Sequence, residues 1–331
     1  MKLGLIGLGT MGSPMMRRLV DHVHHVVGFD VDADARNRAA ELGDLATTTA
    51  SIAELVAELP APRTVWLMLP AGAITESALQ ELAPHLSAGD LVVDGGNSDF
   101  RDAGRRAEEL AAHGIGLCDV GVSGGQWGWK TGYGLTAGGE PTDIARILPV
   151  LSALAAPEAY AHVCPLGSGH LVKAIHNGVQ YAVMQSYAEG YALLDAHDGL
   201  DALSAMRVYQ NGCSIRSFLL GEIVTALENQ LDISELPTAV PDSGMGRWTA
   251  EEAIRLAVPT PTLATALHAR FASRDSGAAF RVSRMNRARA NNRRGLSSLP
   301  VRSGGLYGDT GWPNIPEIER AAGNGGIREG A

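Results

Sequence analysis

A narrow polar stripe in an otherwise apolar segment is the feature of this sequence best suited to chemistry. At about 100° per residue of an α-helix, one side of the segment carries Lys173, His176, Asn177, Gln180 and Met184. The intervening positions are small or apolar, whereas a surface helix carries charge over a wide face. The stripe is therefore predicted to face a cavity, where burial lowers a lysine pKa and makes the group a general base near neutral pH. A buried structural polar network is the alternative.

A second candidate site is the turn at residues 7–12, which reads Gly-Leu-Gly-Thr-Met-Gly. It follows an apolar run at 2–6 and precedes a helix-like stretch at 14–20. Glycines in this context permit a tight turn and bring backbone N–H groups at a helix N-terminus close to a pyrophosphate. The predicted cofactor contacts of this turn are Gly7, Gly9, Thr10, Met11 and Gly12.

An acidic residue, Asp30, stands eighteen residues after Gly12, at the end of the next apolar run. Its carboxylate can accept hydrogen bonds from a ribose 2′-hydroxyl and would repel a 2′-phosphate. Val31 follows, where an NADP-binding protein would often carry arginine. These residues predict NAD as the preferred cofactor over NADP, while the alternative is that Asp30 only starts a turn. The further predicted cofactor contacts, after later strands, are Leu69, Pro70 and Asn97.

The elements that would position these residues alternate in the first half of the chain. Strand-like runs are expected at 2–6, 26–30, 65–69, 91–94, 116–120 and 134–137. Helices are expected at 14–20, 33–42, 51–59, 74–85, 103–113 and 144–155. This alternation indicates a parallel sheet covered by helices on both faces, a Rossmann-type doubly wound α/β domain at residues 1–166.

The character of the chain changes at Gly167, where a glycine- and serine-containing cluster suits the entry to a long helix. Strand signals end there, and helices are expected at 171–196, 202–209, 215–227, 250–257 and 262–272. We therefore predict an all-α C-terminal domain at 167–290, for substrate binding and dimerisation. Residues 291–331, rich in glycine, arginine and proline, are predicted to form a tail.

Composition excludes several classes of protein. The net charge of −9 argues against a nucleic-acid binder, and no apolar segment approaches the ~20 residues that cross a membrane. Cys118, Cys164 and Cys213 lie far apart, and the histidines at 22, 24 and 25 have no carboxylate or cysteine partners nearby, so no metal site is expected. With no secretory signal after Met1, the chain is expected to be cytoplasmic.

From Met1 to about Arg287 the sequence resembles the decarboxylating 6-phosphogluconate dehydrogenase family. The motifs that carry the resemblance are Lys-x-x-His-Asn-Gly at 173–178, Gly-Val-Ser-Gly-Gly at 121–125 and Asp-Gly-Gly-Asn-Ser at 94–98. Three further segments, at 126–128, 214–217 and 246–249, resemble its short-chain, generally NAD-using branch. Sister 3-hydroxyacid dehydrogenases share the cofactor turn and the Ser-Gly-Gly loop, but typically lack His-Asn-Gly after the lysine.

The resemblance implies an NAD-dependent enzyme that converts 6-phosphogluconate, a phosphorylated sugar acid, into ribulose 5-phosphate, CO₂ and NADH in the pentose phosphate pathway, and that works as a homodimer. Lys173 matches the general base, and His176 and Asn177 match substrate-binding positions. The residues that would line the pocket beside the nicotinamide are Asn97, Ser123, Gly124 and Gly125. Tyr181 and Arg270 match positions that hold the phosphate, which the planar arginine fork can bind bidentately.

The sequence departs from the family pattern at two places. The family has glutamate at the position of Gln180, as the general acid that protonates C1 of the enediol after CO₂ leaves. Glutamine cannot deliver a proton at a useful rate, so that step must use water, His176 or another group. A Phe-Gly-Gly-His-like segment is replaced by Asn-Asn-Arg-Arg-Gly at 291–295, where the arginines could substitute.

These departures favour the alternative of a diverged dehydrogenase acting on another sugar acid or hydroxy acid. A catalytically silent cofactor-binding protein is a third possibility, and the lysine in the stripe speaks against it.

Overall fold

The computed structural model describes residues 1–229 and 233–274. The predicted tail at 291–331 and the segment at 291–295 lie outside the described residues. The division of the chain at residues 167 and 291 stays a prediction. In the described ranges, no helix is both long and apolar enough to cross a membrane.

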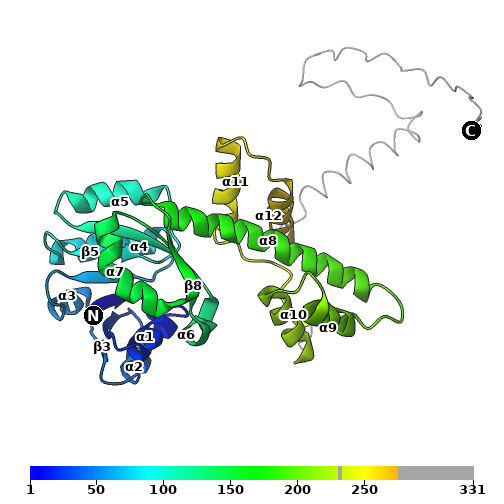
Figure 1. Ribbon diagram of the computed structural model, residues 1–331, viewed down its shortest axis with the longest axis horizontal. Helices are drawn as coiled ribbons and strands as arrows, with labels where there is room; N and C mark the ends of the chain where they lie inside the picture. Colours follow the sequence, from blue (N-terminus) through cyan, green and yellow to red (C-terminus); the bar gives the residue numbers. More distant parts are fainter. Residues whose placement is uncertain (230–232, 275–331) are drawn as a thin grey trace, which may run out of the picture. The chain divides into compact units, whose positions relative to one another are not determined.

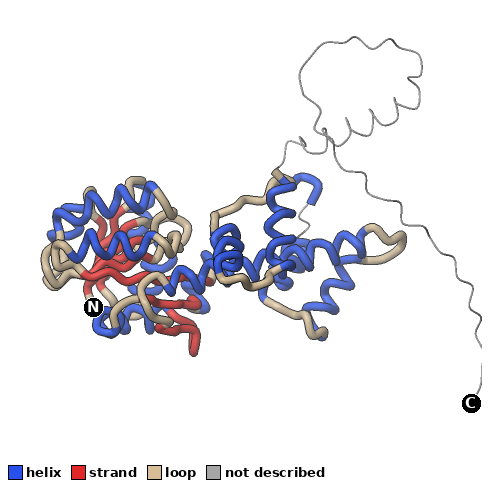
Figure 2. The backbone as a smooth tube through the Cα atoms, turned by 90° about the horizontal axis from the view of Figure 1, so that it is seen from above, coloured by secondary structure: helices blue, strands red, loops and turns tan. Residues whose placement is uncertain are grey.

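One sheet organises the first half of the chain (Figures 1 and 2). It has eight strands in the order β3-β2-β1-β4-β5-β6-β7-β8. The strands are β1 (Lys2–Ile6), β2 (His25–Phe29), β3 (Ala46–Thr48), β4 (Thr64–Leu67), β5 (Leu91–Asp94), β6 (Gly116–Ser123), β7 (Tyr133–Gly138) and β8 (Ala155–His162). Strands β1 to β6 are mutually parallel, as predicted. The expectation of a wholly parallel sheet is wrong for β7, which is antiparallel to β6. The connection at 124–132 is too short for the crossover of a dozen or more residues that a parallel pair needs.

Helices cover both faces of this sheet, so the doubly wound α/β prediction is confirmed (Figure 1). The helices of this half are α1 (Gly12–Asp21), α2 (Ala33–Ala40), α3 (Ile52–Ala57), α4 (Ala73–Leu82), η1 (Ala83–His85), α5 (Asp102–Ala111), η2 (Gly125–Trp127), α6 (Gly128–Thr131) and α7 (Pro141–Leu154). Buried side chains of α1, α2 and α7 share one core, and those of α3, α4 and α5 share the other. The strands contribute side chains to both cores, because successive residues of a strand point to opposite faces of the sheet. In β4, Val65 and Leu67 enter one core and Trp66 enters the other.

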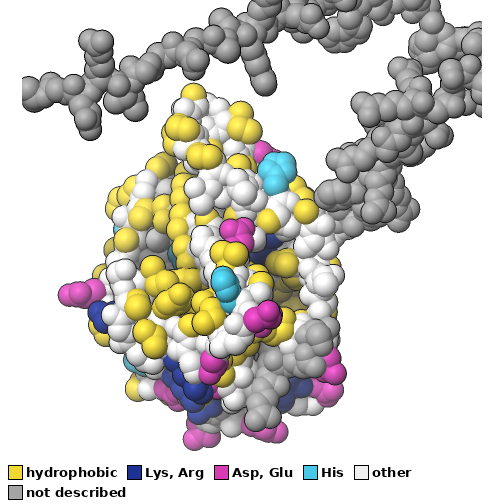
Figure 3. All heavy atoms as spheres, turned by 90° about the vertical axis from the view of Figure 1, so that its right-hand side faces the viewer, with side chains coloured by type: hydrophobic (Ala, Val, Ile, Leu, Met, Phe, Trp, Pro, Cys, Tyr) yellow, Lys and Arg dark blue, Asp and Glu magenta, His cyan; other side chains and the backbone are white. Residues whose placement is uncertain are grey.

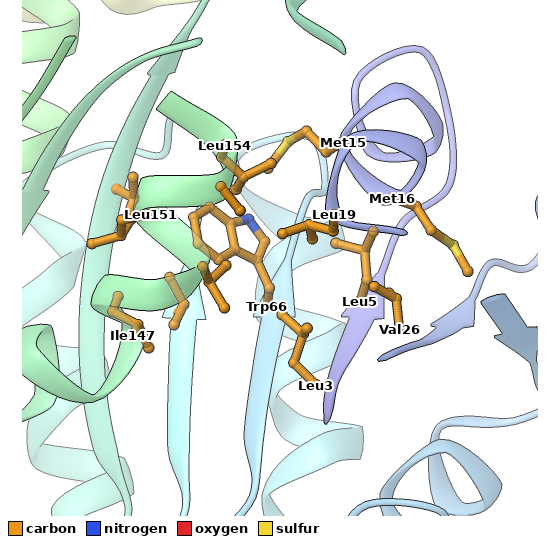
Figure 4. Close-up of a cluster of buried hydrophobic side chains, with 14 of the residues drawn as sticks. Leu3, Leu5, Met15, Met16, Leu19, Val26, Trp66, Ile147, Leu151 and Leu154 are labelled. Carbon is orange, nitrogen blue, oxygen red and sulfur yellow. The ribbon is translucent and has the colours of Figure 1, made fainter. Parts of the chain in front are cut away.

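Trp66 is the largest side chain of the first core and is 1% exposed. Figure 4 shows its indole ring between Leu19 of α1 and Leu151 and Leu154 of α7. This packing joins the helix that follows the glycine turn to the helix that precedes β8. The helix that follows the cofactor turn is therefore packed firmly into the core of the sheet.

The second part of the described chain is helical, which confirms the predicted all-α character. Its helices are α8 (Ser168–Asp195), α9 (Ala202–Gly212), α10 (Phe218–Glu228), η3 (Ile233–Glu235), α11 (Met245–Arg255) and α12 (Pro261–Ser273). Helices α11 and α12 pack beside α8 around Tyr181, whereas α9 and α10 pack with its later turns around Tyr187 (Figure 1). Close approach of α11 to α8 depends on Gly178 and Gly246, because a β-carbon on either would meet Thr249 at 2.8 Å or Tyr181 at 2.6 Å.

Several element boundaries differ from the expectation for local reasons. The helix expected from residue 215 begins at Phe218, because the Ser217 hydroxyl accepts the Leu220 N–H at 3.0 Å and caps it. The helix expected from residue 250 begins at Met245, directly after Gly244 with φ +93°. Strands β3 and β8 were not expected at all.

Candidate active site

The beginning of α8 is tied to the sheet by a buried carboxylate. Asp119 of β6 accepts the backbone N–H of Gly167 at 2.6 Å and that of His170 at 2.7 Å. The ring of His170, which is 2% exposed, lies 3.0 Å through Nε2 from the Asp94 carbonyl oxygen. Because a helix start has unpaired N–H groups and a positive dipole end, one carboxylate there both caps and anchors it. The beginning of α8 is thereby held against β6 and the end of β5.

Three residues of the stripe form one cluster at this anchored end. Lys173 is 9% exposed, and its Nζ lies 3.3 Å from Nδ1 of His176. The same Nδ1 lies 3.0 Å from Oδ1 of Asn177, and Nε2 of His176 lies 3.5 Å from the Ser123 hydroxyl. A proton on Nδ1 can be donated to Asn177, and without that proton Nδ1 can accept one from Lys173. The hydrogen bond between Lys173 and His176 therefore depends on whether Nδ1 carries a proton.

Burial shifts the titration of this cluster. It lowers the pKa of Lys173 to about 8. Burial also lowers the pKa of His176, with a further lowering from the charge of Lys173 and an opposing contribution from the Asn177 hydrogen bond. A lysine with such a pKa is neutral in a useful fraction near pH 7 and can take a proton.

A cavity of about 680 Å³ opens beside the cluster. It brings together nine of the predicted site residues, namely Met11, Asn97, Ser123, Gly124, Gly125, Lys173, His176, Asn177 and Gln180. The Ser-Gly-Gly loop can form this wall because Gly124 and Gly125 have φ values of +134° and +59°. A β-carbon on Gly125 would have no atom within 4 Å, so the backbone there is open to a ligand.

Asn97 has a structural role in addition to its place in the cavity wall. Its side-chain amide donates to the Val122 carbonyl at 3.2 Å, and its side-chain oxygen accepts the Val122 N–H at 3.0 Å. Its φ is +53°, a left-handed conformation that asparagine tolerates better than most residues. This pair joins the segment after β5 to the end of β6. The amide group therefore shapes the cavity by holding two of its walls together.

Tyr181 and Arg270 come together, but outside the lining of this cavity. The Arg270 guanidinium stacks 3.6 Å above the Tyr181 ring centroid and donates to the Pro241 carbonyl at 2.7 Å. Arg247 and Arg274 lie close by, each 3.4 Å from the Asp242 carboxylate. Two guanidinium groups thus share the Asp242 carboxylate, and a third, that of Arg270, is bound to the neighbouring Pro241 carbonyl, which leaves a local excess of positive charge.

The glycine turn has the form of a phosphate cradle. Gly7 has φ +96°, and a β-carbon there would collide with the Met68 carbonyl oxygen. A β-carbon on Gly12 would collide with the Gly7 carbonyl oxygen, whereas one on Gly9 would have nothing within 4 Å. The fold thus requires glycine at positions 7 and 12. Gly9 leaves open space, which allows a dinucleotide to approach the backbone closely. Gly9 and Thr10 also line a cavity of about 540 Å³ beside Trp127.

Asp30 supports the turn and also lines a cavity. Its carboxylate accepts the Leu8 N–H at 2.7 Å and the Asp32 N–H at 2.9 Å. It lines a cavity of about 330 Å³ together with Gly7, Leu69 and Glu81. Pro70 is not in that lining, and its carbonyl accepts the Thr75 hydroxyl at 2.9 Å. The turn lies where the order of strands reverses between β1 and β4, the usual place for a nucleotide in such sheets.

Three cavity residues come from α10 and were not predicted. Phe218, Leu219 and Glu222 line the 680 Å³ cavity together with residues of the stripe on α8. Their spacing of three and four residues puts them on one side of a helix. No local signal in the sequence connects this side of α10 with residue 173, because the two helices meet only through the tertiary fold.

Two family models account for most of the chain. The NAD binding domain of 6-phosphogluconate dehydrogenase matches residues 2–167. The C-terminal domain of 6-phosphogluconate dehydrogenase matches residues 169–298.

Individual relatives agree with these matches. The chain is 41% identical over 277 residues to the NAD(+)-dependent, decarboxylating 6-phosphogluconate dehydrogenase of Haloferax volcanii, covering 83% of this chain and 91% of that protein. It is 32% identical over 286 residues to the NAD(+)-dependent, decarboxylating enzyme of Bacillus subtilis, covering 82% of this chain but only 61% of that longer protein.

Solved structures agree in fold. Plasmodium falciparum 6-phosphogluconate dehydrogenase, solved with its cofactor NADP+ and with its substrate, has a TM-score of 0.75 at 24% identity over 91% of this chain and 66% of that one. Mycobacterium tuberculosis 3-hydroxyisobutyrate dehydrogenase has a TM-score of 0.66 at 24% identity, covering 84% of this chain and 94% of that one.

Proposed function

The chain belongs to the 6-phosphogluconate dehydrogenase family and is an NAD(P)-dependent dehydrogenase, and from this we propose that it oxidatively decarboxylates 6-phosphogluconate or a close analogue, with NAD preferred over NADP. The observation that carries the proposal is the Lys173–His176–Asn177 cluster at the wall of a cavity that also reaches the Ser-Gly-Gly loop. A half-exposed lysine on a helix surface would offer no comparable base.

Lys173 is the base in this proposal. The nicotinamide of NAD, when bound, supplies the acceptor for the hydride that leaves the substrate carbon. As the hydride leaves, Lys173 takes the hydroxyl proton, and the charge on its Nζ is then close to the new carbonyl oxygen. Lys173 returns that proton to the oxygen as the carbon–carbon bond to CO₂ breaks. His176 and Asn177 orient the lysine, and Ser123 with the two following glycines holds the substrate.

The fit of a dinucleotide to the turn supports the cofactor assignment. Gly7 and Gly12 make the tight backbone, Gly9 leaves room for the pyrophosphate, and Thr10 and Met11 continue the surface at the start of α1. Leu69, two residues after the end of β4, would contact the adenosine part. The chemistry of this cradle requires no metal, and the described residues hold no group of three or more metal-type ligands.

The preference for NAD rests on charge. Two carboxylates, Asp30 and Glu81, line the cavity in which the ribose would lie, and a 2′-phosphate brings about −1.5 to −2 charge. Arg36 lies nearby, but its guanidinium donates to the carbonyl oxygens of Asp30 at 2.7 Å and Val31 at 3.3 Å. The local balance therefore favours a free 2′-hydroxyl.

A phosphorylated substrate is supported by the arginine cluster. Arg270 stacks on Tyr181, Arg247 and Arg274 pair with Asp242 beside it, and guanidinium groups bind phosphate bidentately. Tyr181 follows Lys173 by eight residues, which is ~12 Å along the axis of α8. An extended sugar acid of six carbons with a terminal phosphate has a comparable length. One end would thus lie at the lysine and the other near the arginines.

The second candidate is a dehydrogenase of another sugar acid or hydroxy acid, and Gln180 is the observation that favours it. Gln180 lines the cavity, and its side-chain amide is too weak an acid to protonate a carbon atom. An enzyme that stops at the keto acid would need no such proton.

A panel of phosphorylated and unphosphorylated sugar acids and 3-hydroxyacids separates the two candidates. NADH formation and CO₂ release are measured in parallel with each substrate. The proposal predicts that 6-phosphogluconate has the highest kcat/KM and gives both products. A 3-hydroxyacid as the best substrate, with NADH but no CO₂, would establish the second candidate instead.

We also propose that the active form is a homodimer. Large apolar side chains are exposed on the helices of the second part, among them Leu193 at 70% and Val208 at 61%. Hydrophobic side chains are prominent on the face drawn in Figure 3. Exposed apolar surface of this extent is typical of a face that a partner covers.

A further inference from the structure

The 680 Å³ cavity contains three side chains that can exchange protons, Lys173, His176 and Glu222. Among the described residues that line it, Glu222 is the only carboxylate. Oxidative decarboxylation needs two different proton transfers, one from a hydroxyl group to a base and one from an acid to carbon. The cavity must therefore supply a donor as well as Lys173.

The α8 wall is poorly suited to that second transfer. Lys173 and His176 lie one helical turn apart with their nitrogens 3.3 Å from each other, so they reach the same part of a substrate. The carbon of an enediol accepts a proton perpendicular to its plane, while the hydroxyl proton leaves within the plane. A donor carried by a different helix of the cavity lining meets this requirement better than a neighbour of the base. Gln180, the remaining polar group of the stripe in this cavity, cannot act as an acid.

We infer that Glu222 on α10 is the proton donor that completes the reaction, protonating the carbon from which CO₂ has left. This inference rests on the proposed function, and it concerns a residue outside the stripe on α8.

The fold positions Glu222 with two independent constraints. Tyr187 of α8 donates its hydroxyl hydrogen to the Ile215 carbonyl at 2.7 Å and lies 3.0 Å from the Ser217 hydroxyl, which caps α10. This contact ties the start of α10 to α8 two turns beyond Gln180. On α10, Leu220 at 0% and Val224 at 6% exposure are buried against Met206 of α9.

Burial of Leu220 and Val224 sets the rotation of α10 about its axis. The side that carries Phe218, Leu219 and Glu222 is consequently turned to the cavity. Glu228, on the same helix, is directed elsewhere, since its carboxylate pairs with Arg207 of α9 at 2.7 Å. Glu222 is itself exposed, so its carboxyl group is open to solvent as well as to the cavity.

After CO₂ has left, the substrate is an enediol, and Lys173 is neutral because it has returned its proton to the oxygen. Lys173 removes the proton from the hydroxyl group on the oxidised carbon, and the carbonyl forms. The electron pair of the carbon–carbon double bond takes the proton of the Glu222 carboxyl group. The enzyme is left with a lysine ammonium and a glutamate carboxylate, and exchange with water restores both.

The reverse of this step can be measured without net oxidation. Ribulose 5-phosphate is incubated with enzyme and NADH in D₂O, and exchange of its C1 hydrogen is followed by NMR. Glu222→Gln should slow the exchange by ~10²–10⁴-fold, the usual effect of losing a general acid. The first-turnover formation of NADH from 6-phosphogluconate should be nearly unchanged, because it needs only Lys173. Glu228→Gln removes the same charge from the same helix outside the cavity and is the matched control.

A second variant separates chemistry from structure. Gln180→Glu in the Glu222→Gln background returns a carboxyl group to the same cavity from the α8 wall. Exchange should recover by at least ~10-fold if a proton donor was lost. Slow exchange without recovery would assign Glu222 a structural role and overturn the inference.

The failures of the two proposals can be told apart. If the wild-type protein releases CO₂ and Glu222→Gln exchanges at the wild-type rate, the inference alone is wrong, and the donor is His176 or water. If the wild-type protein neither releases CO₂ from 6-phosphogluconate nor exchanges the C1 hydrogen, the proposed function is wrong, and the inference falls with it.

Discussion

Gly121 and Lys173 meet where the beginning of α8 passes β6, and a β-carbon on Gly121 would lie 2.6 Å from Cβ of Lys173. The same β-carbon would lie 2.5 Å from the Gly169 carbonyl oxygen and 2.7 Å from the Thr136 hydroxyl. The Thr136 hydroxyl donates to that Gly169 carbonyl at 3.0 Å, so there is no room for a further atom between β6 and α8. The position of Lys173 in the cavity therefore depends on residue 121 of β6 being a glycine.

Replacing this glycine should move the base without unfolding the protein. In Gly121→Ala the added methyl group must push the start of α8 away, and overpacking of this kind costs about 1–3 kcal/mol. Displacement of a catalytic group by ~1 Å can cost ~100-fold in rate, so we expect kcat to fall by at least ~10-fold. Affinity for NAD should hardly change, because the glycine turn lies elsewhere.

Gly104→Ala is the matched control for this substitution. Gly104 lies in α5, and a β-carbon there would have nothing within 4 Å. Its kcat should equal that of the wild type. A wild-type kcat in Gly121→Ala would mean that the position of Lys173 does not depend on this contact.

The pH dependence of the reaction should follow Lys173. Its folded-state pKa, lowered by burial to about 8, means that the neutral base is lost as the pH falls below that value. The logarithm of kcat/KM should rise with a slope of one up to about pH 8 and then level off, because this parameter reports groups of the free enzyme. A kcat/KM that is flat or falling between pH 6 and 8 would exclude a lysine with this pKa as the base.

Cofactor preference should respond to charge beside Asp30. Wild-type kcat/KM should be at least ~10-fold higher with NAD than with NADP, because Asp30 and Glu81 both face the ribose cavity. Val31 is 88% exposed, so Val31→Arg combined with Glu81→Gln adds a cation and removes an anion without touching the Leu8–Asp30 hydrogen bond. The NAD-to-NADP ratio should then fall by ~10-fold.

Glu58→Gln is the control for the cofactor variants. Glu58 pairs with Lys2 at 3.5 Å and does not line the ribose cavity. It should leave the ratio unchanged. Equal or inverted constants in the wild type would contradict the assignment of NAD as the preferred cofactor.

The proposed homodimer should be visible in solution. Sedimentation of the full chain at micromolar concentration should give twice the mass of 34.7 kDa. Leu193→Glu, which puts a charge on an exposed apolar position of α8, should shift the equilibrium towards monomer. A stable wild-type monomer at that concentration would refute the dimer.

Local patterns were sufficient for the long elements and insufficient for two strands. β3 has three residues, two of them threonine, and is too short to produce an apolar run. β8 reads Ala-Ala-Pro-Glu-Ala-Tyr-Ala-His and stands at the edge of the sheet, where alternation is weak. Its first residue directly follows α7, so the helical pattern conceals the boundary. The edge position, and not local composition, makes this segment a strand.

In the candidate site, too, local sequence patterns predict only part of the arrangement. Lys173, His176, Asn177 and Gln180 belong to one helix, so the helical period alone predicts that they share a side. The stack of Arg270 on Tyr181 joins two helices separated by a long stretch of chain, and no spacing rule predicts it. Glu222 was missed for the same reason. The use of Asn97 as a clamp on Val122 could also not be foreseen, because it depends on where β5 and β6 end relative to each other.

The most direct test of the account is the fate of the carboxyl carbon. The purified protein is given 6-phosphogluconate labelled with ¹³C at C1 and an excess of NAD, and NADH and ¹³CO₂ are counted together. Oxidative decarboxylation predicts equal amounts of the two products from the wild-type protein, and neither from Lys173→Met, which should still bind NAD. NADH without ¹³CO₂, or no reaction with this substrate, would contradict it.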